Sequence, residues 1–263
     1  MLGRYATALI TAATAVALTG SPASASIIQV DNAAFTASAG LITFSAVNDK
    51  FRPGTFNPTY TPADYGGDAN ATTVTFGGFF TGQSLGTADT CPTGAAPTGC
   101  VVGSPSGPLT LDPNSPETII LGDSARPETS PVLAGTGARI NSLDGPVAIK
   151  FSVPQYGVGL DGGYFDSIGS TAISAFDASG NEIGTVVNSK TGVEFLGLVT
   201  GDGSATIAGL LFHLVGPEVK GFDVDNIRFG VQGQVASPVP EPASMIVLAS
   251  ALVGLGMIRC RGA

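Results

Sequence analysis

Hydrophobic and polar residues alternate along much of the second half of the chain. In VAIKFSV, residues 147–153, the residues Val, Ile, Phe and Val alternate with Ala, Lys and Ser. This period of two predicts a strand with one buried face. Similar runs predict further strands, which begin at Leu41, Thr72, Thr171, Glu182, Val193, Ala205 and Val224.

Turn-forming sequences separate these predicted strands. They lie at residues 177–181 (DASGN), 200–203 and 216–218, and they are rich in Gly, Pro, Asp and Asn. From Val147 onward a new strand begins about every ten residues, which is typical of an antiparallel β-sandwich. We expect no amphipathic helix between Ser26 and Ser237, so the predicted fold class is all-β.

The stretch from Lys50 to Arg139 has a looser pattern. It is rich in Gly and Pro and contains only short strand candidates. We interpret it as long loops, around residues 50–140, inserted into the first half of the same sandwich. A separate small N-terminal lobe is the alternative.

Composition and charge narrow the possible partners. Among the 263 residues 37 are Gly, 18 are Pro and only 12% are charged, as expected of a loop-rich β protein. Residues 26–242 hold 8 Lys or Arg against 20 Asp or Glu, a net charge of −12. Because phosphate groups are bound by basic side chains, nucleic acid is not an expected partner. The negative charge would attract cations.

The N-terminus predicts export. Arg4 precedes an apolar stretch at residues 5–18, and Ala23-Ser24-Ala25 fits a signal peptidase site. We therefore interpret residues 1–25 as a signal helix that is cleaved, so that the mature chain begins near Ser26. A buried helix is the alternative.

Export makes a disulfide possible in the first half of the chain. Cys91 and Cys100 lie in the Gly- and Pro-rich loop CPTGAAPTGC. We expect them to form a disulfide, because exported proteins fold in an oxidising compartment. Two free thiols are the alternative, and their spacing does not match a CxxC redox or metal motif.

The C-terminus contains an apolar segment with a basic end. Residues 243–258, from Ala243 to Ile258, carry no charge. As a helix they span about 24 Å, which suffices for membrane insertion if the bilayer thins from its usual core of about 30 Å. Arg259 and Arg261 follow and place the C-terminus inside the cell. These features predict a transmembrane helix that anchors the chain in the inner membrane.

Pro240, Glu241 and Pro242 precede this helix, and the two prolines keep the segment extended. Residues 238–263 resemble the PEP-CTERM sorting signal, because the Pro-Glu-Pro motif, the apolar helix and the basic tip follow one another in the same order. The resemblance implies export by a Gram-negative bacterium that makes exopolysaccharide. It also implies processing by an exosortase, a membrane-embedded cysteine protease-like enzyme, and release to the cell surface or the extracellular matrix. A plain C-terminal anchor is the alternative.

The last predicted strand of residues 26–237 contains an irregularity. In GFDVDNIRFG, Phe222 and Val224 share one phase of the alternation, whereas Ile227 and Phe229 share the other. One extra residue must be accommodated near residues 225–226, so we expect a β-bulge there.

Oxygen-bearing side chains gather at this irregularity. Asp223, Asp225 and Asn226 are candidate ligands of Ca²⁺, a hard cation that binds carboxylate and carbonyl oxygens. The alternative is that Asp225 and Asn226 only form hydrogen bonds with the bulge backbone. Residues 177–181 also carry oxygen side chains, but a hairpin turn is the favoured interpretation there.

Residues 147–230 carry a second resemblance. The segments YFD, AFDASGNEIG, EFLGL, AGLLF and GFDVDNIRFG are similar to ectodomains that precede PEP-CTERM signals. They are also similar to jelly-roll carbohydrate-binding modules whose last strand carries an Asp-Asn pair. The resemblance implies a jelly-roll-like sandwich for residues 26–237.

Other candidate residues lack a supporting motif. His213, the only histidine, falls on the face opposite Phe212 and Leu214, and no nucleophile signature such as GxSxG accompanies it. Aromatic side chains can stack on sugar rings, although core packing is expected for most of them. The candidates are Tyr60, Tyr156, Tyr164 and Phe165.

These observations predict an exported, non-enzymatic protein of the cell surface or matrix. Its expected role is structural or weakly glycan-binding, with extracellular polysaccharide as the partner and calcium as a candidate cofactor. Its expected processing partners are signal peptidase and the exosortase. The alternatives are a specific carbohydrate-binding module and a polysaccharide hydrolase, since paired carboxylates can hydrolyse glycosides.

Overall fold

A computed structural model describes the part of the chain that was predicted to be the ectodomain. The described residues are 26–44, 54–66, 72–122, 131–137, 143–218 and 223–236. The predicted signal helix at residues 1–25 and the sorting tail at residues 238–263 lie outside them. None of the helices within the described ranges has the length and apolar character of a membrane span.

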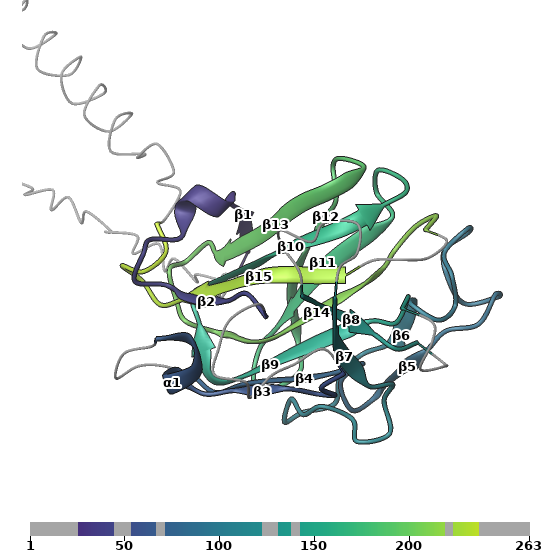
Figure 1. The fold of residues 1–263 in the computed structure, drawn as a ribbon, viewed down its shortest axis with the longest axis horizontal. Coiled ribbons are helices and arrows are strands. Elements are labelled where there is room, and N and C mark those ends of the chain that lie inside the picture. Colours follow the sequence, from purple (N-terminus) through teal and green to yellow (C-terminus); the bar gives the residue numbers. More distant parts are fainter. Residues whose placement is uncertain are drawn as a thin grey trace, which may run out of the picture.

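Two antiparallel sheets pack face to face, which confirms the predicted all-β sandwich (Figure 1). The strands of sheet I are β1 (Ile27–Gln29), β2 (Gly40–Ile42), β7 (Thr118–Leu121), β8 (Val132–Gly135), β10 (Gly157–Phe165), β13 (Gly192–Thr200) and β15 (Asp223–Gly230). Their order is β1-β13-β10-β15-β8-β7, and β2 also pairs with β15. The long strands β10, β13 and β15 therefore form the middle of the sheet.

Sheet II faces sheet I across the core. Its strands are β3 (Thr59–Tyr60), β4 (Val74–Gly77), β9 (Val147–Gln155), β11 (Thr171–Phe176), β12 (Glu182–Val187) and β14 (Ile207–Leu214). They lie in the order β12-β11-β14-β9-β4-β3. Two further strands, β5 (Gln83–Leu85) and β6 (Val101–Gly103), pair only with each other. The short helices are α1 (Pro62–Tyr65) and the 3₁₀ turn η1 (Asn32–Ala34).

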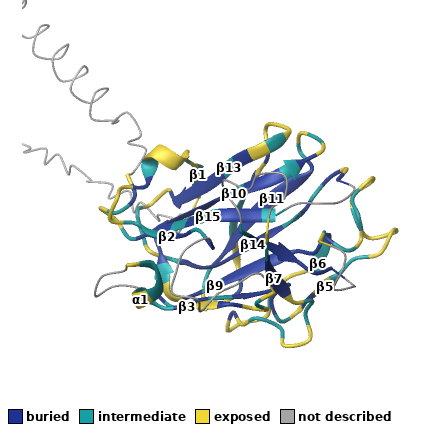
Figure 2. Ribbon diagram, viewed as in Figure 1, coloured by how far each residue is buried: buried dark blue, intermediate teal, exposed yellow. Residues whose placement is uncertain are grey.

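The main core lies between the two sheets, whose strands are mostly buried (Figure 2), and side chains of both sheets form it. In β9, for example, Val147, Ile149 and Phe151 are buried in this core, as the alternation in VAIKFSV predicted. Burial of apolar area at about 25 cal/mol per Å² is the main stabilising contribution of such a core. The members of this core that come from sheet I include Leu133, Leu160, Leu196, Leu198, Val224 and Ile227.

β10 is a central strand that the sequence pattern did not predict. It contains glycine at positions 157, 159, 162 and 163, and glycine weakens the strand signal. Neighbouring rings occupy the space that side chains would need. A Cβ on Gly162 would lie 2.7 Å from the ring of Phe165, and a Cβ on Gly159 would lie 2.5 Å from the ring of Phe195. Glycine therefore permits close packing here.

Residues 78–117, hereafter the covering segment, cross the outer face of sheet II. Phe80 and Leu109 of this segment pack against Phe176 and Leu211 of the sheet in a second apolar cluster. The strands on either side of the segment extend the two sheets, since β4 pairs with β9 and β7 pairs with β8.

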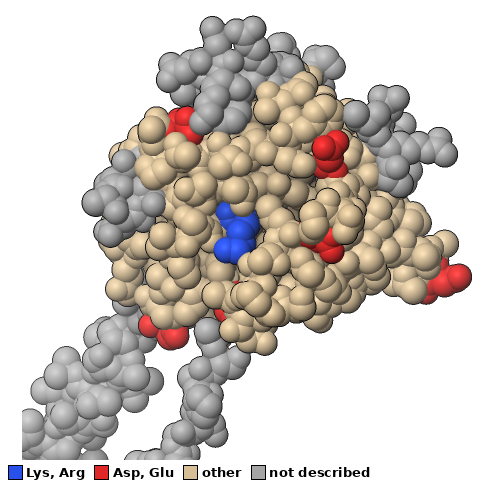
Figure 3. Space-filling model, turned by 90° about the horizontal axis from the view of Figure 1, so that it is seen from below, with Lys and Arg blue, Asp and Glu red and all other residues tan. Residues whose placement is uncertain are grey.

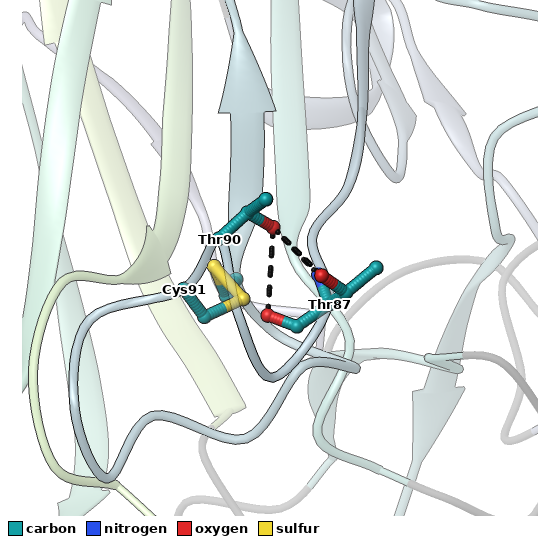
Figure 4. The surroundings of a disulfide bond; sticks show 4 residues. Thr87, Thr90 and Cys91 are labelled. Carbon is teal, nitrogen blue, oxygen red and sulfur yellow. Dashed lines mark hydrogen bonds between the residues drawn. A yellow bond between two sulfur atoms is a disulfide. The ribbon is translucent and has the colours of Figure 1, made fainter.

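Cys91 and Cys100 form a disulfide within the covering segment, which confirms the predicted bond. The turn before it is shaped by Thr87, whose amide donates a 2.8 Å hydrogen bond to Oγ1 of Thr90 (Figure 4). Cys100 is only 1% exposed and belongs to the main core. The amide of Leu214 in β14 also donates to the carbonyl of Gly99 at 3.0 Å. The disulfide therefore closes a loop within the covering segment, and the burial of Cys100 and the bond to Leu214 tie this loop to the sandwich.

The two ends of the described sandwich meet on the outer face of sheet I. Phe35 pairs with Val235 in an isolated bridge. Both residues pack on Tyr156 and Val199 in a third apolar cluster. This cluster covers one part of the outer face, and the candidate site lies on another.

Candidate functional site

A β-bulge interrupts β15, as the sequence predicted. Gly159 pairs with Arg228 and Asp161 pairs with Asp225, so one residue of β10 faces two residues of β15. Asn226 lies in this bulge. Its φ of +47° is left-handed, a conformation that Asn tolerates better than most residues.

The bulge places polar side chains on the outer face of sheet I. Val224 and Ile227 are three positions apart, yet both are buried in the main core. Strand alternation therefore directs Asp225 away from the core. Asp161 lies opposite Asp225 on β10, and it follows the core residue Leu160. The two carboxyl groups thus belong to the same face.

Asn226 links these two carboxyl groups. Its backbone amide donates a 2.7 Å hydrogen bond to Oδ1 of Asp225. Its Nδ2 donates to Oδ2 of Asp161 at 2.8 Å and to Oδ2 of Asp225 at 3.3 Å. The bonds between Asp225 and Asn226 are the contacts expected if these two residues stabilise the bulge.

A cavity of about 120 Å³ opens at this point. Asp223, Asp225 and Asn226 all line it, so the structure brings the three predicted calcium ligands to one place. Its other lining residues are Val132, Asp161, Gly162, Gly163, Tyr164, Val193 and Val224. A volume below the roughly 300 Å³ of a typical small-molecule pocket suits a small polar group or one part of a larger ligand.

Burial perturbs one carboxyl group of the cavity. Desolvation raises the pKa of Asp161 above its ordinary value, although the hydrogen bond from Asn226 and the positive charge of Arg228 act in the opposite direction. Asp161 is therefore easier to protonate than a solvated aspartate. In its protonated form it can donate a hydrogen bond as well as accept one.

Calcium binding at Asp223, Asp225 and Asn226 stays a prediction. Among the described residues, no group of three or more His, Cys, Asp or Glu side chains is placed to hold a metal ion. Oxygen ligands from Asn226 or from backbone carbonyls would have to complete any calcium site.

Of the four aromatic residues considered for sugar stacking, one lines the cavity. Tyr60, Tyr156 and Phe165 are at most 2% exposed and are core residues. Tyr164 is half-buried and borders the cavity next to Gly163. Core packing thus accounts for most of this set, as expected.

His213 lies on the outer face of sheet II, beside a cavity of about 230 Å³ under the covering segment. Thr185 donates a 2.8 Å hydrogen bond to Oε1 of Glu182, because a carboxylate only accepts. Ser174 must then donate to Thr185 at 2.6 Å, and Nε2–H of His213 must donate to Ser174 at 3.1 Å. His213 is therefore a hydrogen-bond donor to Ser174, which leaves it unable to act as the base that would activate this serine.

On the face seen from below, the acidic side chains of the described residues do not cluster as they do at the cavity (Figure 3). There Lys or Arg atoms occupy a small hollow near the centre, and Asp and Glu atoms lie apart from one another. The described part of that face therefore has no acidic gathering like the one at the cavity.

Sequence reasoning missed Asp161 as a site residue. The available signal was the segment LDGGYF, where two glycines follow an aspartate in a run that otherwise alternates. Glycine inside a strand often marks the close approach of another group. Here a Cβ on Gly163 would lie 2.6 Å from Cγ2 of Val193.

Residues 177–181 form the predicted hairpin turn. In this turn Oδ1 of Asp177 accepts hydrogen bonds from the amides of Ser179 and Asn181.

The predicted sorting and anchor residues lie outside the described residues. They are Pro240, Glu241, Pro242, Ala243, Ile258, Arg259 and Arg261.

Comparison with known proteins identifies no relative of this chain. No family model, no curated protein and no solved structure matches it. The interpretation of the cavity therefore depends on its own geometry and chemistry.

Proposed function

We propose that this chain is an exported protein whose β-sandwich binds a glycan on the outer face of sheet I. The cavity at the bulge is the observation that carries the proposal. It combines Tyr164 with carboxylate and amide groups and with the backbone of two glycines. Sugars are bound by this combination, since their hydroxyl groups form hydrogen bonds and their apolar faces pack on aromatic rings.

The strand order supports a jelly-roll assignment. β13-β10-β15-β8 in sheet I faces β12-β11-β14-β9 in sheet II. Eight consecutive strands, β8 to β15, are thus divided four and four between the sheets, as in an eight-stranded double-sheet jelly roll. Lectin domains are among the proteins with this architecture.

Binding is tested by affinity electrophoresis of the full chain in gels that contain hydroxyethyl cellulose, dextran, galactomannan, xylan or alginate. We expect at least one polymer to retard the protein. Tyr164→Ala should weaken that retardation about tenfold in apparent affinity. Phe56→Ala is the control, because Phe56 is an exposed aromatic residue outside the cavity. Absence of retardation by every polymer would contradict the proposal.

The sorting part of the proposal concerns the ends of the chain. Its support is the signal-peptide pattern at residues 1–25 and the ordered PEP-CTERM-like features at residues 238–263. Signal peptidase would remove the first segment, and an exosortase-type enzyme would process the second at the inner membrane. The sandwich would then act at the cell surface or in the exopolysaccharide matrix.

Removal of residues 238–263 tests this sorting. The truncated protein should leave the membrane fraction and be recovered from the periplasm or the medium, because it lacks the anchor. Immunodetection in cell fractions measures the change. Continued retention in the membrane would contradict the sorting proposal without affecting the glycan-binding proposal.

A hydrolase is the second candidate function, and one observation favours it. Asp161 and Asp225 accept hydrogen bonds from the same amide nitrogen at 2.8 and 3.3 Å, so these oxygens lie within about 6 Å of each other. Retaining glycosidases place two carboxyl groups about 5–5.5 Å apart, and their general acid has a raised pKa. Release of reducing sugar from a gel polymer, abolished by Asp161→Asn, would replace the binding proposal with this one.

A further inference from the structure

A second cavity adjoins the one at the bulge. It has a volume of about 390 Å³ and lies over the junction of β1 and β13. Its lining includes Gln29, Lys190 and Phe195. Val193 lines both cavities and is 38% exposed. It therefore forms the wall between two hollows on the same face.

Together the two hollows cross most of sheet I. Their lining residues come from β1 at one end, with Gln29, and from β8 at the other, with Val132. The strand order between them is β1-β13-β10-β15-β8. Neighbouring strands lie about 4.8 Å apart, so four spacings span about 19 Å. This length exceeds that of a single sugar ring and suits several linked rings.

The charges along these hollows restrict the ligand. Five carboxyl groups line them, from Asp31, Asp161, Glu194, Asp223 and Asp225, against one basic side chain. Glu194 is already engaged, since its carboxylate accepts hydrogen bonds from the amides of residues 189 and 190. An anionic polymer would be repelled by the remaining carboxylates. Hydroxyl groups of an uncharged polymer can instead donate to them.

We infer that the two hollows are consecutive subsites for an extended, uncharged polysaccharide that passes over Val193. This inference rests on the proposed glycan binding and deepens it, because it assigns the ligand's length and charge. Aromatic contacts are available at both subsites, from Phe195 at one and Tyr164 at the other. A monosaccharide would fill one hollow only.

The test uses the full chain and oligomers of one to six units, prepared from the polymer that most strongly retards the protein in the electrophoresis described above. Isothermal titration should show that affinity rises about tenfold or more from one unit to six. Val193→Arg should lower the affinity for the six-unit oligomer about tenfold. It should change the affinity for the single sugar unit much less. Val187→Arg is the matched control, since Val187 is a 39% exposed strand residue on sheet II.

The outcomes separate the inference from the proposal on which it rests. If no polymer binds, the glycan-binding proposal itself fails, and the inference fails with it. If binding occurs but is independent of oligomer length, or is unaffected by Val193→Arg, only the inference of two subsites fails. Strongest binding to alginate, the anionic polymer, would overturn the assigned ligand charge. Unchanged thermal unfolding of both Arg variants would show that they fold normally.

Discussion

The side-chain amide of Asn226 donates a 2.8 Å hydrogen bond to Oδ2 of Asp161, which is 65 positions earlier in the chain. This bond connects β15 to β10 at the point where the bulge interrupts their pairing. One residue thus stabilises an irregular backbone and positions a carboxyl group in the candidate site.

The first prediction concerns this backbone. Asn226→Ala should lower the free energy of unfolding by about 2–3 kcal/mol, because alanine loses the bonds to Asp161 and Asp225 and is disfavoured at a positive φ. Asn226→Gly should lower it by about 1 kcal/mol less, since glycine accepts this φ without strain. Urea unfolding of both variants measures the difference. Equal losses would show that the backbone conformation carries no strain in the native protein.

The second prediction addresses calcium. Asp225→Ala should lower the melting temperature in chelator, because Oδ1 of Asp225 accepts the amide of Asn226. If calcium binds, it should raise the melting temperature of the original protein but not that of the variant. Thermal unfolding with millimolar calcium or with chelator distinguishes these effects. The same loss under both conditions would leave Asp225 with its bulge role alone.

The third prediction concerns the disulfide. Replacing both Cys91 and Cys100 by serine should lower the free energy of unfolding by about 2–3 kcal/mol, as expected for a short closed loop. A reducing agent should cause a similar loss in the original protein, measured by thermal unfolding. The double variant is the control for the reagent, and it should not respond further. A large response of that variant would indicate that the reagent acts elsewhere.

The fourth prediction is a pH dependence due to His213. Burial lowers the pKa of this imidazole from 6.5 to about 4. Its Nδ1 is buried and has no hydrogen-bond partner among the described residues, so a second ring proton would lack an acceptor. Between these two pH values the unfolded chain binds more protons than the folded one. Stability is therefore fully present above pH 6.5 and falls as the pH decreases toward 4.

Urea unfolding at pH 7 and pH 4.5 tests this dependence. His213→Gln retains a donor for Ser174 but cannot titrate, so its stability should fall less over this interval, by a difference of about 1–3 kcal/mol. Because His213 is the only histidine, the comparison isolates its contribution from that of the carboxyl groups. Identical pH profiles of the two proteins would contradict the prediction.

Local patterns predicted much of the sandwich. The alternation in residues 147–153 predicts β9, and the change of phase between Val224 and Ile227 predicts the bulge in β15 without any information on its partner strand. The same reasoning failed for β10, because Gly159 and Gly162 remove the side chains by which alternation is recognised. Their role depends on the rings of Phe195 and Phe165, which occupy the vacated space.

Local alternation along the chain is enough to assign the side chains of the regular strands to the core, because a strand turns successive residues to opposite faces. The sequence also located Asp223, Asp225 and Asn226, which are neighbours along the chain. The presence of Asp161, Tyr164 and Val193 beside them is a consequence of the folded arrangement of the strands. Pairing of β10 with β13 and β15 creates that proximity, and pairing depends on contacts between distant segments that no local pattern records.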